Sequence, residues 1–230
     1  MRRKQITQII NTKWCPQLIK QLCSEFLSWF VLKVNATKPF IPVIENALLE
    51  SKINKIINLE STIGAGIETV KPFLKQQPAI TSIPLSKINT QQQRGMYLFV
   101  NAFHQLPAIS AKKTLEEIAK SRNPVVVVEG NNDSLWQLVG MTIFLPVTVI
   151  LSAPFVKPFR WSRILFTYII PVLPVIMVID GCIGLLKLYN PKDLNKLTSS
   201  IKVSDYKWTT GKKDNGRGGK IIYLTGISTN

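Results

Sequence analysis

The stretch INKIINLESTIGAGI, residues 53–67, decides the fold. Its isoleucine-rich first half, residues 53–59, predicts a strand. A loop with Gly64 and Gly66 follows, and we expect a helix over residues 67–75. A strand, a glycine-containing turn and a helix in this order are typical of parallel α/β sheets that bind a ligand at the carboxyl ends of their strands.

Further strands are predicted downstream of this unit. The runs MYLFVN at residues 96–101 and VVVVEG at residues 125–130 predict strands that are buried on both faces. Between them we expect a helix over residues 110–121, capped by Ser110. Residues 78–94 contain two prolines and a polar run, and they predict a loop or a short edge strand. Strands that alternate with helices indicate a mainly parallel sheet.

The two ends of the chain add helices and an antiparallel edge. Residues 4–50 predict helices, the second of them over residues 42–51, because apolar residues recur at helical spacing. Residues 206–210 and 220–227 predict two strands joined by a mobile loop at residues 212–219. We expect four regions: N-terminal helices (1–50), a core (51–134), an apolar helical insertion (135–186), and a C-terminal helix with strands that complete the core (187–230).

The composition limits the classes of partner. The net charge is +16, from 29 basic and 13 acidic residues. This excess reflects either a lysine-rich drift in composition or attraction to anionic lipid headgroups or nucleic acid. No basic run is interleaved with aromatic residues, which argues against nucleic acid. Three cysteines without a CxxC spacing and one histidine argue against a metal site and indicate a reducing, cytoplasmic compartment. No long apolar core follows the basic N-terminus, so a secretory signal is not expected.

The apolar insertion contains two uncharged runs, residues 135–156 and 164–179. The basic residues that separate them are Lys157, Arg160 and Arg163. Three interpretations stay open: a hairpin in the bilayer with this basic turn on the cytoplasmic side, a monotopic or lid module over a lipid-like substrate, and two core helices that cover the sheet. Asp180 follows the second run and needs a partner, which we expect to be Arg160 or Arg163.

Several stretches share the pattern of one enzyme family. The most specific is PFVKPFRWSRILFTY, residues 154–168. The others are NATKPF (35–40), NAFHQL (101–106), Pro171, Pro174, Asp180-Gly181, LYNP (188–191) and YLTG (223–226). Together they span roughly residues 10–228 and resemble bacterial class I S-adenosylmethionine-dependent methyltransferases. The resemblance implies an α/β fold with a Rossmann-like, mainly parallel sheet, N-terminal helices, the apolar helical insertion and a C-terminal antiparallel hairpin.

The resemblance also implies a cofactor site for S-adenosylmethionine at the carboxyl ends of the strands. The family's cofactor positions fall on Asn58, Glu60, Gly64, Gly66 and Asn101. Two of them depart from the family pattern, because Asn58 stands where an acid is expected and Glu60 where a glycine is expected. An ordinary strand-to-helix turn would need the glycines as well.

The segment that should hold the ribose-binding acid is short. About two to three dozen residues of the family pattern are missing between residues 75 and 96, where the second strand and its acid belong. Ser82 and its neighbours offer no carboxylate. Loss of such a charge-assisted pair typically costs a few kcal/mol, on the order of 100-fold in affinity.

The candidate catalytic residue is His104, which matches the Phe-His element of the resemblance and follows a predicted strand. It could act as a general base or position a substrate, and the alternative is a loop histidine packed on aromatic rings. Glu129 and Asn131 end the valine strand at the same edge, and Glu68 follows the glycine loop. No metal ligands are expected.

These features support two hypotheses about function. The first is a methyltransferase-like protein that acts on a hydrophobic, lipid-like or membrane-associated acceptor by direct displacement, with the protein positioning the pair. The second is a catalytically inactive, membrane-associated binding or scaffold module with the same fold. A membrane surface is the expected partner in both, at the cytoplasmic side. The sequence leaves the acceptor and the oligomeric state open.

Overall fold

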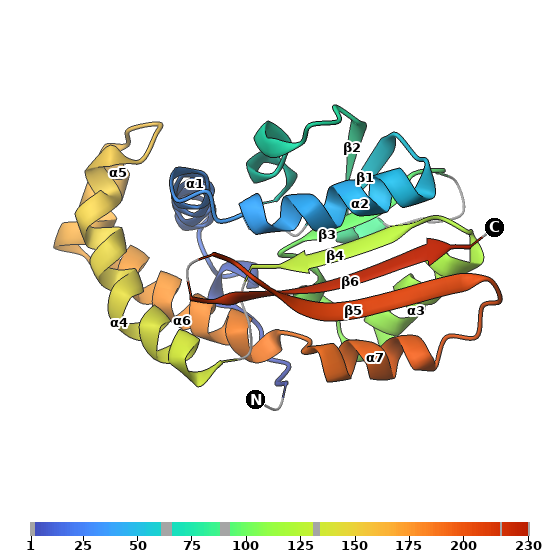
Figure 1. The fold of residues 1–230 in the computed structure, drawn as a ribbon. Helices are drawn as coiled ribbons and strands as arrows, with labels where there is room; N and C mark the ends of the chain where they lie inside the picture. The colour runs from blue at the N-terminus through green and yellow to red at the C-terminus, as the bar shows by residue number, and fades with distance from the viewer. Residues whose placement is uncertain (1–2, 61–65, 88–92, 131–133, 217, 230) are drawn as a thin grey trace. The chain divides into compact units, whose positions relative to one another are not determined.

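Four neighbouring parallel strands, β2, β1, β3 and β4, form one side of a six-stranded sheet of order β2-β1-β3-β4-β6-β5 (Figure 1). β1 (Lys55–Glu60) pairs with β2 (Ala79–Pro84) on one side and with β3 (Met96–Val100) on the other. β4 (Val125–Glu129) continues the parallel ladder beside β3. The chain therefore leaves β1 in opposite directions across the sheet, and a switch point of this kind is where open α/β sheets bind their ligands.

The far edge of the sheet is antiparallel. β6 (Lys220–Ser228) pairs with β4, and β5 (Tyr206–Asp214) pairs with β6. This arrangement confirms the predicted α/β class, with a mainly parallel, Rossmann-like sheet and a C-terminal antiparallel hairpin. The hairpin strands are longer than predicted, because β5 extends through the lysines that we had placed in the loop.

The computed structural model describes residues 3–60, 66–87, 93–130, 134–216 and 218–229. Its residues group into two units. We call the group formed by residues 36–60, 66–130 and 189–229 the sheet unit. We call the group formed by residues 3–35 and 134–188 the helical unit.

In the sheet unit, helices cover both faces of the sheet. α2 (Ile41–Ser51) lies on one face, and α3 (Ala108–Lys120) and α7 (Pro191–Ser199) lie on the other (Figure 1). Every side chain of β3 and β4 is buried, as expected for strands covered on both sides. α3 begins two residues before the predicted Ser110 cap, because Pro107 precedes it with the fixed φ of a helix start.

The structure overturns one prediction for the segment after β1 and decides between two alternatives for another. The expected helix over residues 67–75 is replaced by two short 3₁₀ turns, η3 (Ile67–Thr69) and η4 (Lys71–Phe73). Pro72 lacks the N–H that would continue an α-helix at this point, and its ring would clash with the preceding turn. Residues 78–94, for which a loop or a short edge strand was expected, contain the edge strand β2, so the second strand of the family pattern is present.

The helical unit contains three main helices. α4 (Leu135–Ser152) packs against α6 (Val172–Lys187), and α1 (Gln17–Lys33) also packs against α6. Shorter turns surround them: η1 (Ile9–Asn11), η7 (Ala153–Phe155), α5 (Trp161–Ile164) and the π-helix η8 (Leu165–Ile169). Their shared core includes Phe26, Val149 and Met177.

The predicted partners of Asp180 are wrong. Its carboxylate accepts hydrogen bonds from the backbone N–H groups of Ile9 (2.6 Å) and Ile10 (2.9 Å). Arg160 and Arg163 pair instead with Glu25 on α1. The N-terminal turn brings its unpaired N–H groups to α6, and two such donors satisfy a buried carboxylate without a cation.

One helix among the described residues, Leu135–Phe155, is long and apolar enough to cross a membrane. The helices Trp161–Ile169 and Val172–Lys187 meet the same criterion only when taken together, and they are bent by 80° at their junction. Only 11% of the apolar stretch of the first helix is buried. Most side chains of α4 are thus exposed, and the three interpretations of the insertion stay predictions.

Candidate functional site

The candidate site lies at the carboxyl ends of β1, β3 and β4. These strands are parallel and adjacent, so their carboxyl ends meet at one edge of the sheet. The side chains at this edge come from Asn58 and Glu60 on β1, from Asn101 and His104 after β3, and from Glu129 on β4. Gly64 and Asn131 lie outside the described residues.

Asn58 is fully buried and ties β1 to its edge partner. Its amide nitrogen donates to Ser82 Oγ on β2 (3.2 Å) and to Glu60 Oε1 (3.3 Å). Glu60 itself is exposed at the end of the strand. The position where the family pattern expects an acid therefore holds a neutral donor. The carboxylate at the end of β1 belongs to Glu60 instead.

Gly66 lies where the chain turns back after β1. Its backbone has φ −83° and ψ −148°, which lies outside the usual helical and extended regions, and a Cβ added to it would meet nothing within 4 Å. No described atom would therefore hinder a side chain at this position. The open space beside the backbone is the feature that a closely approaching ligand would need.

Asn101 holds two strand ends together. It has a left-handed φ of +50°, which asparagine tolerates better than most residues. Its N–H donates to the Val128 carbonyl (2.9 Å), and its Oδ1 accepts from the Gly130 N–H (2.7 Å). A Cβ on Gly130 would lie 3.3 Å from that oxygen, so the glycine allows the close approach. The side-chain oxygen of Asn101 thus holds Gly130, the residue directly after β4, in place.

His104 and Glu129 form a buried pair at this edge. Nδ1 of His104 lies 3.0 Å from Oε2 of Glu129, and the backbone N–H of His104 donates to Oε1 (3.0 Å). Both oxygens of the Glu129 carboxylate therefore contact His104. A carboxylate at Nδ1 makes this nitrogen the proton donor, which gives Nε2 the character of a base or acceptor.

The pair is supported by aromatic packing. Phe103 packs edge-on against Phe99, with ring centroids 5.2 Å apart, and also contacts the ring of Tyr189 (5.3 Å). The hydroxyl of Tyr189 donates to the Leu106 carbonyl (2.8 Å). These contacts fix the short turn η6 (Phe103–Gln105) that carries the histidine.

Sequence reasoning named His104 and placed Glu129 at the same edge, but it did not pair them. The available signal was physical: a glutamate that ends a fully buried valine strand needs a partner. The chain has only one histidine, and it follows the adjacent strand. Among the described residues, no group of three or more His, Cys, Asp or Glu side chains could hold a metal ion.

Carboxylates are scarce along the rest of this edge. The sequence contains no aspartate or glutamate between Glu68 and Glu116, which covers β2, β3 and the segments that follow them. Glu68 lies in η3 rather than at the start of an α-helix. The site can therefore offer the carboxylates of Glu60 and Glu129, and it has no acid beyond the end of β2.

The sheet unit also has a polar groove of about 320 Å³ between α2 and the β5–β6 hairpin. Asn46 and Glu50 line it on one side, and Thr209, Lys213 and Tyr223 line it on the other. None of the predicted cofactor residues contributes to it.

Comparison with known proteins gives similarity in structure only. No protein-family model matches the chain, and no curated protein sequence matches it. One similar solved structure is magnesium protoporphyrin IX methyltransferase (ChlM) from Synechocystis PCC 6803 with bound SAH. It is 8% identical, the match covers 95% of this chain and 91% of that one, and the TM-score is 0.36.

Two further structures are similar at the same level. The O-methyltransferase TomG from Streptomyces achromogenes, in complex with SAM, is 9% identical over 94% of this chain and 91% of that one, with a TM-score of 0.37. LepI in complex with SAH and a substrate analogue is 13% identical over 95% of this chain and 50% of that one, with a TM-score of 0.35. All three scores are below 0.5, so the fold of this chain, a Rossmann-like α/β sheet with an antiparallel edge, is established by its own strand order.

Proposed function

We propose that the sheet unit is a methyltransferase-like domain that binds S-adenosylmethionine at the carboxyl ends of β1 and β3. The observation that carries this proposal is the switch point at β1, followed by open space beside the Gly66 backbone. The sequence resemblance, which spans most of the chain, supports the same ligand.

The residues present fit the methionine part of S-adenosylmethionine better than its ribose. The exposed carboxylate of Glu60 is available for the amino group of the methionine part, and the space at Gly66 suits its approach to the backbone. No acid follows β2, so the ribose hydroxyls lack the partner that the family provides. When bound, the donor supplies an electrophilic methyl group.

His104 is the group that would handle the acceptor. Glu129 holds Nδ1 of the imidazole, so a carboxylate fixes the tautomer and the orientation of this ring at the strand edge, where it could position an acceptor hydroxyl or amine. The remaining contribution of the chain is orientation, because displacement at a methyl group mainly requires alignment of the two reactants. We propose a hydrophobic or lipid-like acceptor at the cytoplasmic face of a membrane, because the helical unit exposes an apolar surface.

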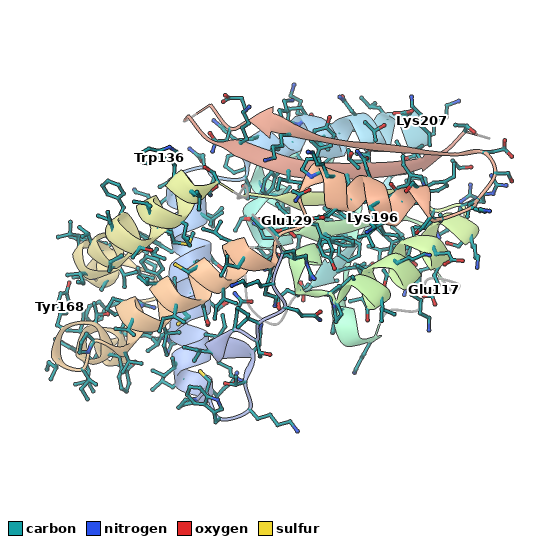
Figure 2. All side chains as sticks on the ribbon, turned by 90° about the horizontal axis from the view of Figure 1, so that it is seen from below. Glu117, Glu129, Trp136, Tyr168, Lys196 and Lys207 are labelled. Carbon is teal, nitrogen blue, oxygen red and sulfur yellow. The ribbon has the colours of Figure 1, made fainter. Side chains whose placement is uncertain are left out.

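Calorimetric titration of the full chain with S-adenosylmethionine and its demethylated product tests this proposal. Gly66→Leu should abolish binding, because the added side chain would fill the open space without meeting described atoms, and thermal unfolding of the variant should show that it still folds. Glu60→Gln should weaken binding, whereas Glu117→Gln, an acid on the outer surface of α3 (Figure 2), should not. Absence of binding by the unmodified chain at millimolar ligand would refute the proposal.

The second candidate function is an inactive binding or scaffold module. The absence of any acid between Glu68 and Glu116 favours it. Replacement of Asn58→Asp together with Glu60→Gly restores the family pattern at β1. If this double variant folds and still shows no affinity for the donor, while the unmodified chain also binds none, the scaffold function is supported.

A further inference from the structure

The helical unit exposes a continuous series of large apolar side chains. They begin on α4 and continue through η7, α5 and η8. Trp136 is 84% exposed and Trp161 is 78% exposed. The most exposed members of this surface, which we call the apolar face, are Trp136, Phe144, Leu151, Phe155, Trp161 and Ile169. Exposure of this extent marks an interaction surface.

The apolar face is distinct from the side of α4 that packs inside the unit. Val149 is buried in the core, and a Cβ on Gly181 of α6 would lie 2.5 Å from Met141 Sδ, which shows how closely the two helices approach. The exposed members occupy the opposite half of the α4 surface. Because α6 already fills the inner side, the outer side needs an apolar partner from outside the unit.

The segment that connects α4 to η8 combines aromatic rings with cations. The rings of Phe159 and Trp161 pack edge-on, with centroids 5.3 Å apart, and Lys157 is exposed beside them. Figure 2 shows Trp136 and Tyr168 near opposite ends of the α4 segment. Amphipathic aromatic rings and lysines are typical of groups that lie at the headgroup level of a bilayer.

The contacts of a buried arginine hold the segment between α4 and η8 in place. The guanidinium of Arg163 is almost fully buried, donates to the carbonyls of Val156 (2.8 Å) and Pro158 (3.0 Å), and pairs with Glu25 (2.5 Å). Arg160 also pairs with Glu25 (2.9 Å). Trp161 lies between these arginines and Phe159 directly precedes Arg160, so both rings are carried by a segment that ion pairs hold in place.

The same ion pairs argue against a hairpin that crosses the membrane. Glu25 belongs to α1, whose outer side carries exposed or half-exposed polar residues, among them Gln21 and Lys20. A crossing hairpin would draw α1 into the hydrocarbon, where each charged side chain costs a few kcal/mol. α6 is also short for a span, because its 16 residues reach about 24 Å against a hydrocarbon core of about 30 Å.

We propose that the helical unit docks on a bilayer from one side, as a monotopic module. The apolar face enters the acyl region, the Phe159–Trp161 end and Lys157 lie at the headgroups, and α1 stays in water. The net charge of +16 favours membranes that contain anionic lipids. The proposal rests on the proposed function in one respect, namely that the membrane holds the methyl acceptor. Donor binding by the sheet unit is a separate property.

Vesicle co-sedimentation tests the docking surface. The full chain should bind vesicles of phosphatidylcholine and phosphatidylglycerol, and high salt should weaken this binding without abolishing it. Leu151→Asp on the apolar face should weaken it by about tenfold or more. Ile109→Asp should not, although Ile109 is 86% exposed, because it lies on the sheet unit. Equal effects of the two variants, or a dimer in solution that binds no vesicles, would overturn the proposal.

The side of insertion is tested with a membrane-impermeant maleimide trapped inside the vesicles. Phe159→Cys and Lys207→Cys are compared in a Cys182→Ser background, since Cys15 and Cys23 are buried. A monotopic module leaves both new thiols unlabelled from the inside, and Lys207→Cys reacts only with reagent added outside. Labelling of Phe159→Cys from the inside would show a crossing hairpin and overturn the proposal. Donor titration of Leu151→Asp separates the two proposals, because a failure of docking leaves donor affinity unchanged.

Discussion

The substitution Glu129→Gln tests the assignment of the buried pair most directly. Glutamine keeps an oxygen that can accept from the backbone N–H of His104, as Oε1 does now at 3.0 Å. Its second group is an NH₂ donor, which would face Nδ1 in place of the carboxylate oxygen at 3.0 Å. Two donors cannot face each other, so the imidazole should move its proton from Nδ1 to Nε2.

The size of the effect follows from the two hydrogen bonds. A hydrogen bond to a charged group contributes about 1.5–3 kcal/mol and a neutral one about 0.5–1.5 kcal/mol. Exchange of two charge-assisted bonds for neutral ones, offset in part by removal of a buried charge, should lower the free energy of unfolding by about 1–3 kcal/mol. Glu117→Gln, which loses only an exposed pair with Lys113, should change it by less than about 0.5 kcal/mol.

The chain has a single histidine, so ¹⁵N-histidine labelling gives one unambiguous imidazole signal. Long-range ¹H–¹⁵N correlation at alkaline pH reports which ring nitrogen carries the proton, and urea titration reports stability. The unmodified chain should show the Nδ1–H tautomer and the variant the Nε2–H tautomer. If both show the same tautomer with equal stability, Glu129 does not hold the ring and the proposed role of His104 loses its basis.

Three further predictions concern the rest of the chain. Glu25→Gln leaves the buried Arg163 without its carboxylate and should cost about 3–5 kcal/mol in urea unfolding, whereas Glu116→Gln, which loses an exposed pair, should cost less than about 1 kcal/mol. Burial raises the pKa of the Cys23 thiol to about 12, so iodoacetamide at neutral pH should modify it only after denaturation, as peptide mass mapping would show. Gly226→Ala places a Cβ 2.5 Å from a tryptophan ring on β5 and should lower the melting temperature through a loss of about 1–3 kcal/mol; an unchanged value would contradict the packing.

The sequence predicted the elements whose patterns are continuous. β3 and β4 are uninterrupted apolar runs, and such runs are stable only between two covering layers. It failed after β1, where a helix was expected to complete a strand–turn–helix unit but Pro72 interrupts the helical hydrogen bonds. It left β2 open between a loop and a short edge strand, because an edge strand with mostly exposed side chains has little apolar pattern to distinguish it from a loop.

The partners of the buried charges were predicted less well than the fold, because these contacts join distant parts of the chain. Asp180 was matched with Arg160 and Arg163 for their closeness in sequence, but α1 supplies their carboxylate and the N-terminal turn satisfies the aspartate. Composition can show that a buried charge needs a partner, but it cannot choose among partners. The partner of each buried charge depends on which helices and turns pack together in the folded chain.

The edge of β1 shows why the fold and the activity need separate tests. The amide of Asn58 donates to Glu60 (3.3 Å) and to Ser82 (3.2 Å), so these three side chains are complementary as they stand. An acid at position 58 alone would bring two carboxylates to hydrogen-bond distance, and like charges so close disfavour ionisation of both. The departures from the family pattern at positions 58 and 60 are therefore coupled. The hydrogen bonds of Asn58 with Glu60 and Ser82 stabilise the end of β1 whether or not the chain binds the methyl donor. For that reason, donor affinity must be measured rather than inferred from the intact sheet.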